Sequence, residues 1–394
     1  MGVVVQKYGG SSVADPASIK FVAEQIVQRR REGDSLVVVV SAMGKTTDQL
    51  LALAHDVAAR PSRRELDMLV TSGERISMAL LSMAIEELGE RAVSFTGSQS
   101  GIITEPTHQG ARIVDVRPFR LREALDEGRI VIVAGYQGVS TEREVTTLGR
   151  GGSDTTAVAL AGALDATSCE IYSDVAGVYT ADPRVCAGAR RLEAISYDSM
   201  RMMAKAGAKV LNAEAVAFAE KNAVTILACK TGNGLRESTR VSGDTEGVGS
   251  NRVLAVVGNR NILFAEGERQ KMLEAWNQWS AMGATPLVLE ANREQGSTPR
   301  SRGVLPLVDC VDSEGLLLDL NEKGVTARRA GAVSLVGPGV EGNRGCYDEM
   351  IRLDPADAAP ILSQPGCVTA VYPEDNVDEI VPALHRQWVE KDVA

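Results

Sequence analysis

The stretch KYGGSS, residues 7–12, directly follows the apolar run Val3–Val5 and precedes a helical pattern over residues 16–31. Glycines at such a position let backbone amides approach an anion, and the following helix N-terminus adds partial positive charge. Lys7 adds a compact cation at the end of the expected strand. This order predicts an α/β fold that binds an anionic ligand at its strand ends, although an ordinary strand-to-helix turn explains the same residues.

The alternation of strands and helices continues to about residue 235. Leu36–Val40 and Ile130–Ala134 are uninterrupted apolar runs, which are typical of strands buried on both faces of a parallel sheet. This pattern predicts a mainly parallel sheet with helices on both faces. The segments that alternate with these runs are expected helices over 47–59, 74–88, 154–164 and 210–221 and expected strands over 170–172 and 225–229.

The rest of the chain differs in composition. Residues 236–251 are rich in Gly, Ser, Thr and charge and lack a periodic pattern, so we expect a linker there. In residues 252–394 a pattern of strand, helix and strand occurs about twice. The sequence therefore predicts a first domain over 1–235, a linker, and two small α+β modules.

Charge and composition exclude several classes of protein. The net charge is −10, which gives no electrostatic basis for nucleic-acid binding. No apolar run approaches the ~20 residues that span a bilayer, and the first residues lack a secretory pattern. The six cysteines include no C-x-x-C pair, which is typical of free thiols. We expect a cytoplasmic protein with no membrane or nucleic-acid partner.

Two more loops have the composition of ligand sites. GRGGSDTT at 149–156 opens onto a helix, and its glycines, Arg150 and Asp154 predict an anion cradle with one forked recognition group; a flexible surface loop is the alternative. SAMGKTT at 41–47 ends like a Walker A loop, but its upstream glycine position is Val39, so we reject a P-loop.

Three further segments have features of ligand sites. In TSGER at 71–75, Glu74 either caps a helix or binds a substrate amine. SDVAGVYTADPR at 173–184 follows a strand, where open α/β sheets bind ligands. Lys209 is expected to head a helix, which is unfavourable unless an anion joins it. The three histidines form no plausible nucleophile–base set, and no spacing suggests zinc, so the expected metal is Mg²⁺ carried with a nucleotide.

Together these motifs resemble the aspartate kinase (aspartokinase) family of the amino-acid kinase superfamily, over about residues 1–235. The resemblance implies the amino-acid kinase fold and transfer of the γ-phosphoryl of Mg-ATP to the β-carboxylate of L-aspartate. A carboxylate with a pKa of about 4 is already ionised at neutral pH, so this reaction needs no general base. The stretches that carry the resemblance are KYGGSS, SAMG at 41–44, TSGER, FTGSQSGI at 95–102, GRGGSDTTA at 149–157 and SDVAGVYTADPR.

The resemblance also implies roles for individual residues. Lys7 would contact the transferring group, Lys209 would hold ATP phosphates, and Asp154 would orient both lysines. Glu74 would pair with the substrate α-ammonium and Arg150 with a substrate carboxylate. The other expected contacts are Ser41 and Thr47 with the substrate and Gly9, Gly10, Ser173, Asp174, Tyr179 and Arg184 with the nucleotide.

The C-terminal part resembles the paired ACT domains of the family, which bind effector amino acids between subunits, so the resemblance implies a homodimer or higher homo-oligomer. Two features depart from the family pattern. AEGE at 265–268 replaces an expected turn, and Gln364-Pro365-Gly366 replaces polar residues. These departures predict little or no inhibition by lysine plus threonine.

Two alternatives stay open at this point. The first is a kinase of another small carboxylate, such as N-acetylglutamate, and the second is a non-catalytic regulatory homologue. Glu74 argues against the first, because an acylated nitrogen has no charge to pair with it. The presence of Lys7, Arg150, Asp154 and Lys209 argues against the second.

Overall fold

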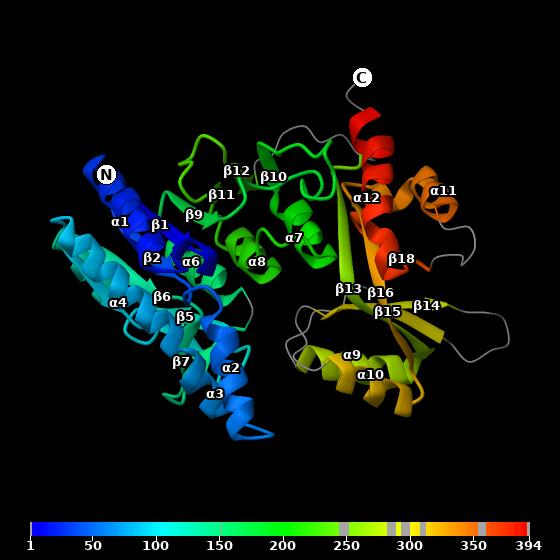
Figure 1. The fold of residues 1–394 in the computed structure, drawn as a ribbon, viewed down its shortest axis with the longest axis horizontal. Helices are drawn as coiled ribbons and strands as arrows, with labels where there is room; N and C mark the ends of the chain where they lie inside the picture. The colour runs from blue at the N-terminus through cyan, green and yellow to red at the C-terminus, as the bar shows by residue number, and fades with distance from the viewer. Residues whose placement is uncertain are drawn as a thin grey trace. The chain divides into compact units, whose positions relative to one another are not determined.

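The structure is a computed structural model and describes residues 2–149, 151–243, 252–281, 289–292, 300–307, 313–353 and 360–391. The chain divides into two units (Figure 1), which are described separately. Unit 1 comprises Met1–Val178, Glu193–Tyr197 and Val210–Asp244. Unit 2 comprises Tyr179–Leu192, Asp198–Lys209 and Thr245–Ala394.

An eight-stranded sheet forms the centre of unit 1. Its strand order is β10-β12-β11-β9-β1-β2-β6-β3. The six strands from β11 to β3 are parallel, whereas β12 is antiparallel to β11 and parallel to β10. The predicted mainly parallel sheet is therefore confirmed. The strand bounds are β1 Val3–Tyr8, β2 Ser35–Val40, β3 Ala92–Phe95, β6 Ile130–Ala134, β9 Ser168–Ser173, β10 Ala194–Ser196, β11 Ile226–Lys230 and β12 Thr239–Ser242.

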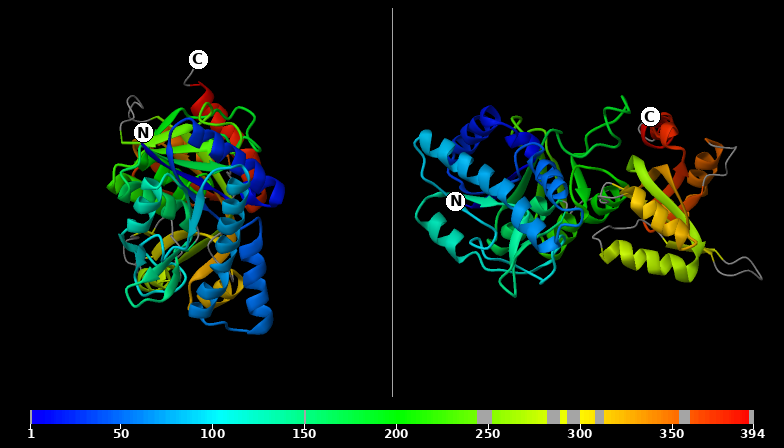
Figure 2. Two further views of the ribbon diagram at one scale, coloured as in Figure 1. Left: turned by 90° about the vertical axis from the view of Figure 1, so that its left-hand side faces the viewer. Right: turned by 60° about the horizontal axis from the view of Figure 1, so that its bottom comes forward.

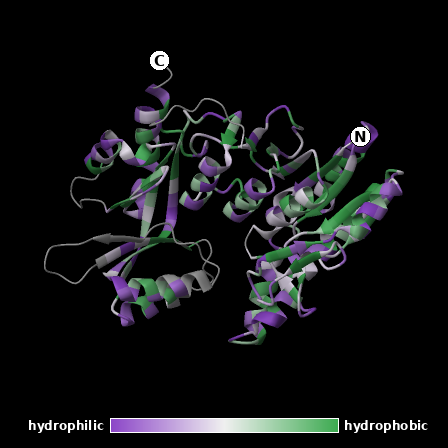
Figure 3. Ribbon diagram, turned by 180° about the vertical axis from the view of Figure 1, so that it is seen from behind, coloured by the Kyte–Doolittle hydropathy of each residue, from purple (hydrophilic) through white to green (hydrophobic). Residues whose placement is uncertain are grey.

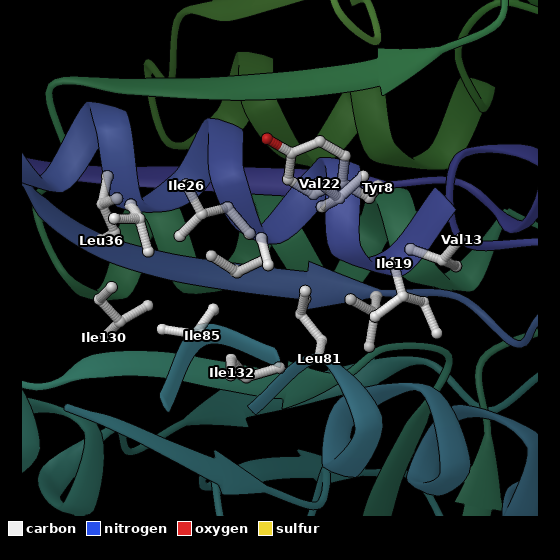
Figure 4. Close-up of a cluster of buried hydrophobic side chains, with 14 of the residues drawn as sticks. Tyr8, Val13, Ile19, Val22, Ile26, Leu36, Leu81, Ile85, Ile130 and Ile132 are labelled. Atoms are coloured by element: carbon white, nitrogen blue, oxygen red, sulfur yellow. The ribbon is translucent and has the colours of Figure 1, made fainter. Parts of the chain in front are cut away.

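Helices cover both faces of this sheet, as Figure 2 shows from two further directions. Residues Leu36–Val40 of β2 are fully buried because side chains of both faces meet helices. On one face α1 and α4 pack in a core that contains Ile26, Leu81 and Ile132 (Figure 4); on the other, α6 contacts β1, β2 and β9. The helices are α1 Pro16–Arg31, α2 Thr46–Val57, α3 Arg63–Val70, α4 Ser72–Glu87, α5 Phe119–Asp126, α6 Gly152–Ala163, α7 Tyr197–Ala206 and α8 Ala213–Lys221.

A four-stranded sheet in unit 1, of order β5-β4-β7-β8, was not predicted. Its strands are three or four residues long, too short for a clear alternation of apolar and polar residues. The expected linker over 236–251 also contributes a strand, β12, to the large sheet, so that stretch is not irregular throughout. The bounds of the small sheet are β4 Ile102–Thr104, β5 Ile113–Val116, β7 Gln137–Ser140 and β8 Val145–Thr147.

A buried polar network lies on the α1 face of the large sheet. The Glu170 carboxylate is fully buried and accepts hydrogen bonds from Gln6 Nε2 and Tyr172 Oη, both at 2.9 Å. Arg29 Nη2 lies 3.3 Å from the other carboxylate oxygen. The rings of Tyr8 and Tyr172 stack with centroids 4.8 Å apart. Because side chains alternate along a strand, Lys7 points to the opposite face.

Unit 2 is built on one antiparallel sheet of order β14-β15-β13-β16-β18-β17. The two predicted α+β modules thus share a continuous sheet, because β13 pairs with β16 on both sides of a bulge between Asn259 and Ile262. The stretch 265–268, expected as a turn, is the paired end of β13. The bounds are β13 Ala255–Glu268, β14 Leu289–Asn292, β15 Arg300–Pro306, β16 Thr326–Val336, β17 Ile361–Gln364, β18 Cys367–Tyr372, α9 Arg269–Ala281, α10 Ser313–Glu322, α11 Arg344–Arg352 and α12 Val377–His385.

Hydropathy follows these layers. In the large sheet, Leu36–Val40 of β2 and the whole of β6 are hydrophobic, whereas the outer helices also carry hydrophilic residues (Figure 3). By length and composition one helical stretch, Arg63–Glu87, could cross a membrane. Of its most apolar window, 44% is buried inside the protein. Core helices of soluble proteins share this character, so the stretch is weak evidence for a membrane helix.

Candidate active site

Lys7 and Asp154 form an ion pair at the carboxyl edge of the large sheet. Lys7 Nζ lies 2.7 Å from Asp154 Oδ1, and their side chains are only 13% and 11% exposed. Asp154 lies in the first turn of α6, where the helix dipole favours a negative charge. The pair therefore holds a cation in place at the end of β1, with partial shielding from water.

The loop before α6 depends on its glycines. Gly149 and Gly151 have φ values of +75° and +70°, a region that side chains with a Cβ seldom adopt. A Cβ on Gly151 would also lie 2.4 Å from Asn212 Nδ2. Asn212 is the N-cap of α8, because its Oδ1 accepts hydrogen bonds from the amides of Glu214 and Ala215. The loop is thus packed against a capped helix end.

Glu74 is a buried carboxylate with one uncommitted oxygen. It is 3% exposed, and its Oε1 accepts a hydrogen bond from the Ala42 amide at 3.2 Å. Its Oε2 is buried and has no hydrogen-bond partner. Burial raises the pKa of Glu74 to about 7. A cationic ligand group would complete this arrangement, because an ionised carboxylate in such a place lacks compensation.

The loops after β1 and β2 meet the start of α4 beside Glu74. Gly44 donates its amide to the Gly10 carbonyl at 3.1 Å. A Cβ on Gly10 would lie 2.8 Å from the Ala42 carbonyl oxygen, so this position requires glycine. Ser41 is half-buried at the end of β2, and Thr47 is half-buried in the first turn of α2. The sequence-predicted substrate residues Ser41, Thr47 and Glu74 therefore lie around the same junction.

A cavity of about 400 Å³ lies at the carboxyl ends of β1, β9 and β11. The predicted nucleotide residues Ser173 and Asp174 line it. The Gly9 amide donates to the Tyr172 carbonyl at 3.2 Å beside this edge. The other lining residues were not predicted. They come from the 3-10 helix η1 (Gly10–Val13), from α1 and from the end of β11 and the residue after it; they are Ser11, Ser12, Ala17, Ser18, Phe21, Lys230 and Thr231. Two of them, Ser11 and Ser12, belong to the KYGGSS stretch, so their place in that motif could have identified them as lining residues.

The other predicted residues fall elsewhere. Arg150 lies outside the described residues. Tyr179, Arg184 and Lys209 belong to unit 2, where Arg184 Nη2 lies 2.7 Å from Asp182 Oδ2. Lys209 does not head a helix as expected: α8 begins at Ala213, because the strong N-cap at Asn212 sets its start.

One group of metal-ligating side chains comes together among the described residues. Cys186, His385 and Glu390 in unit 2 have ligand atoms within 4.8 Å of one another. Sequence spacing missed the group because its members are far apart in the chain. Both ring nitrogens of His385 are within hydrogen-bond distance of other groups, Nδ1 of Glu390 at 3.0 Å and Nε2 of Thr180 at 2.8 Å. Burial raises the pKa of the Cys186 thiol, which disfavours the thiolate that a metal ion would need. The hydrogen bonds of His385 are therefore sufficient to explain why these side chains lie together.

Comparison with known proteins places the chain in a family. Residues 2–228 match the model of the amino acid kinase family. An aspartokinase from Corynebacterium glutamicum is 42% identical over 98% of this chain and 96% of its own length. The chain belongs to the amino acid kinase family, among the aspartokinases. An aspartokinase from Mycolicibacterium smegmatis is 61% identical, over 57% of this chain and 54% of its own length.

Solved structures agree with this assignment of fold. Escherichia coli aspartokinase III in complex with aspartate and ADP (R-state) has a TM-score of 0.81 at 22% identity and covers 97% of this chain and 99% of its own. Aspartate kinase from Synechocystis has a TM-score of 0.57 at 31% identity, over 98% of this chain and 69% of its own. The resemblance, the fold class and the kinase assignment made from the sequence are thereby confirmed for this amino acid kinase. Its relatives favour neither the acetylated-substrate kinase nor the non-catalytic homologue.

Proposed function

We propose that this chain transfers the γ-phosphoryl of Mg-ATP to the β-carboxylate of L-aspartate, which gives 4-phospho-L-aspartate and ADP. The names of the full-length relatives support aspartate phosphorylation. One observation carries the proposal: two charged groups lie at the same edge of the large sheet. One is the Lys7–Asp154 ion pair, which is partly shielded from water, and the other is the buried Glu74 carboxylate, whose Oε2 has no hydrogen-bond partner.

Catalysis in this proposal rests on position and charge. The attacking β-carboxylate is ionised at neutral pH, so the site needs no base. Lys7 contacts the transferring phosphoryl group and offsets the charge that it carries. Asp154 holds Lys7 through their 2.7 Å contact, so the ammonium is in place before the substrates bind.

The acceptor is recognised by its two charged ends. Glu74 Oε2 pairs with the α-ammonium group of aspartate, which supplies the cation that the buried carboxylate lacks. Arg150 pairs with a substrate carboxylate, and Ser41 and Thr47 help to seat the amino acid. An acceptor with an acylated nitrogen would leave Glu74 buried without a partner, and this excludes it as a good substrate.

The nucleotide occupies the cavity beside Ser173 and Asp174, with the backbone at Gly9 and Gly10 near its phosphates. Mg²⁺ prefers oxygen ligands and binds together with nucleotide phosphates. The hydroxyls around the cavity and the exposed Asp174 carboxylate fit such an ion. The ion neutralises phosphate charge when it is bound.

The proposal includes the assembly and location expected from the sequence, a homo-oligomer formed through unit 2 in the cytoplasm. Light scattering on the purified protein measures its mass. The activity is tested by coupled ADP release with L-aspartate, N-acetylaspartate and N-acetylglutamate, with the product trapped as a hydroxamate by hydroxylamine. Aspartate-dependent ADP release with hydroxamate formation is expected. Efficient turnover of either acetylated compound in place of aspartate would refute the proposal.

A further inference from the structure

Asp67 is a buried carboxylate to which the reaction assigns no part. It lies in α3 and is fully buried, and three donors satisfy it. Thr147 Oγ1 donates to Oδ1 at 2.7 Å, and His108 Nδ1 lies 2.8 Å from Oδ2. The Gln109 amide contacts both oxygens, at 3.3 and 3.2 Å. A buried carboxylate that loses a hydrogen-bond partner pays the full cost of its desolvation, so these three donors hold their segments against α3.

The donors hold a turn that lies against the loop before α6. Gln109 has a φ of +59°, a conformation that costs a residue with a side chain about 1–2 kcal/mol, and its amide is one of the three donors. The next two amides, of Gly110 and Ala111, both donate to the Thr147 carbonyl, at 3.1 and 2.9 Å. A Cβ on Gly149 would lie 3.3 Å from Gly110 Cα. The turn thus supports the start of the loop that leads to Asp154.

A second contact joins the same helix to the same small sheet. The residue after α3 is Thr71, whose carbonyl accepts a hydrogen bond from the buried Gln137 Nε2 at 3.1 Å. Gln137 pairs with Thr147 between β7 and β8. The contacts therefore close a ring from Asp67 through Thr147 and Gln137 to Thr71. Glu74 follows Thr71 by less than one helical turn, so the ring fixes where Glu74 begins.

We propose that Asp67 is a positioning residue for the acceptor amino acid: it ties the start of the Glu74 helix to the loop that leads to Asp154. The inference deepens the proposed function and rests on it. Displacement of a reacting group by about 1 Å costs of the order of 100-fold in rate. The cavity assigned to ATP is lined by none of the residues of this ring, so the effect falls on aspartate rather than on ATP.

The test uses Thr147, because Asp67 itself could be needed for folding. Thr147→Val removes the hydroxyl that donates to Asp67 and keeps the shape of the side chain, and Thr147→Ser keeps the hydroxyl. Thr146→Val is the matched control: Thr146 is the buried neighbour in β8, and its hydroxyl lies 2.6 Å from that of Thr104 instead. We expect Thr147→Val to raise KM for aspartate about tenfold, a change that equals about 1.4 kcal/mol. KM for ATP should stay within about twofold of the wild-type value, because the lost hydrogen bond is a single one and lies outside the cavity assigned to ATP.

Thr147→Ser should restore the wild-type KM for aspartate, and Thr146→Val should leave it unchanged. The inference is overturned if Thr147→Val leaves KM for aspartate unchanged, raises both KM values equally, or behaves like Thr146→Val. Asp67→Asn, if it folds by circular dichroism, should raise KM for aspartate more than Thr147→Val does. A wild-type protein without aspartate-dependent ADP release would instead overturn the proposed function, and this inference with it.

Discussion

Replacement of Glu74 by Gln tests two effects of the buried carboxylate: its effect on the free energy of unfolding and its part in binding aspartate. Gln can still accept the hydrogen bond from the Ala42 amide, but it carries no charge. In the folded wild type, burial raises the pKa of Glu74 from 4.5 to about 7. The folded state therefore holds a proton that the unfolded state has already released between these two pH values.

The sign of the stability effect follows from this difference. Below pH ~4.5 the carboxyl is protonated in both states and folding gains nothing from a change of pH. As pH rises from 4.5 towards 7, the free energy of unfolding of the wild type falls, because the unfolded state releases a proton that the folded state still holds. The rise of this pKa from 4.5 to about 7 corresponds to about 3 kcal/mol. Glu74→Gln should accordingly be more stable than the wild type at pH 8, and the difference should shrink at pH 5.

Activity should move in the opposite direction. At pH 8 the ionised Glu74 pairs with the ammonium of aspartate, and loss of one member of a buried charge pair costs a few kcal/mol, so KM for aspartate should rise ~100-fold. In the wild type this KM should fall as pH rises from 6 to 8, whereas the variant should show no such dependence. Urea unfolding at pH 5 and 8 measures the effect on stability, and coupled ADP release at pH 6 and 8 measures KM for aspartate. A variant that is destabilised at pH 8, or whose KM for aspartate changes less than threefold, would refute the reasoning.

Other changes test the remaining parts of the site. Lys7→Ala should lower kcat ~100-fold or more, because it removes a cation that contacts the transferring phosphoryl group. Lys20→Ala, on the exposed part of α1, is the control. A folded Lys7→Ala variant with near-normal kcat would show that Lys7 has no part in the mechanism. Asn212→Ala should lower the free energy of unfolding by ~1 kcal/mol through loss of the α8 N-cap, measured by urea denaturation, whereas an unchanged midpoint would contradict that role. Gly10→Ala should destabilise the protein by a few kcal/mol, because its Cβ would lie only 2.8 Å from the Ala42 carbonyl oxygen. A wild-type melting temperature would show that the loops move apart freely.

Features that depend on local pattern could be predicted from the sequence. The five apolar residues that end β2 predicted a strand buried on both faces, and in the structure all five are fully buried. Lys7 ends a strand and Asp154 begins a helix, so the rules for parallel sheets place both at one edge. The start of α8 also follows from the sequence, because Asn212 followed by Glu214 is an N-cap signal. The expectation that Lys209 heads this helix placed its start too early.

Features that depend on distant partners could not be predicted. Asp67 is one acid on a polar helix, and its three donors come from segments far along the chain. β12 contains a single large apolar residue, Val241, and is a strand because β11 and β10 pair with it. Glu266 lies in a paired strand, and Arg302 Nε of the neighbouring strand lies 3.3 Å from its carboxylate. The residues 265–268 alone do not reveal this partner.

The Glu170 network has a consequence for how β1 finds its place. A slip of one residue between β1 and β9 would turn Gln6 and Tyr8 towards α6 and drive the Lys7 ammonium into the aliphatic layer beneath α1. The Glu170 carboxylate would then lose its hydrogen bond from Gln6 while staying buried, so the misaligned chain is penalised twice. A polar core under an α/β sheet thus selects one alignment among several that hydrophobicity alone would allow. Aliphatic replacements at Gln6 and Glu170 should leave a protein that still collapses but pairs its central strands in more than one way.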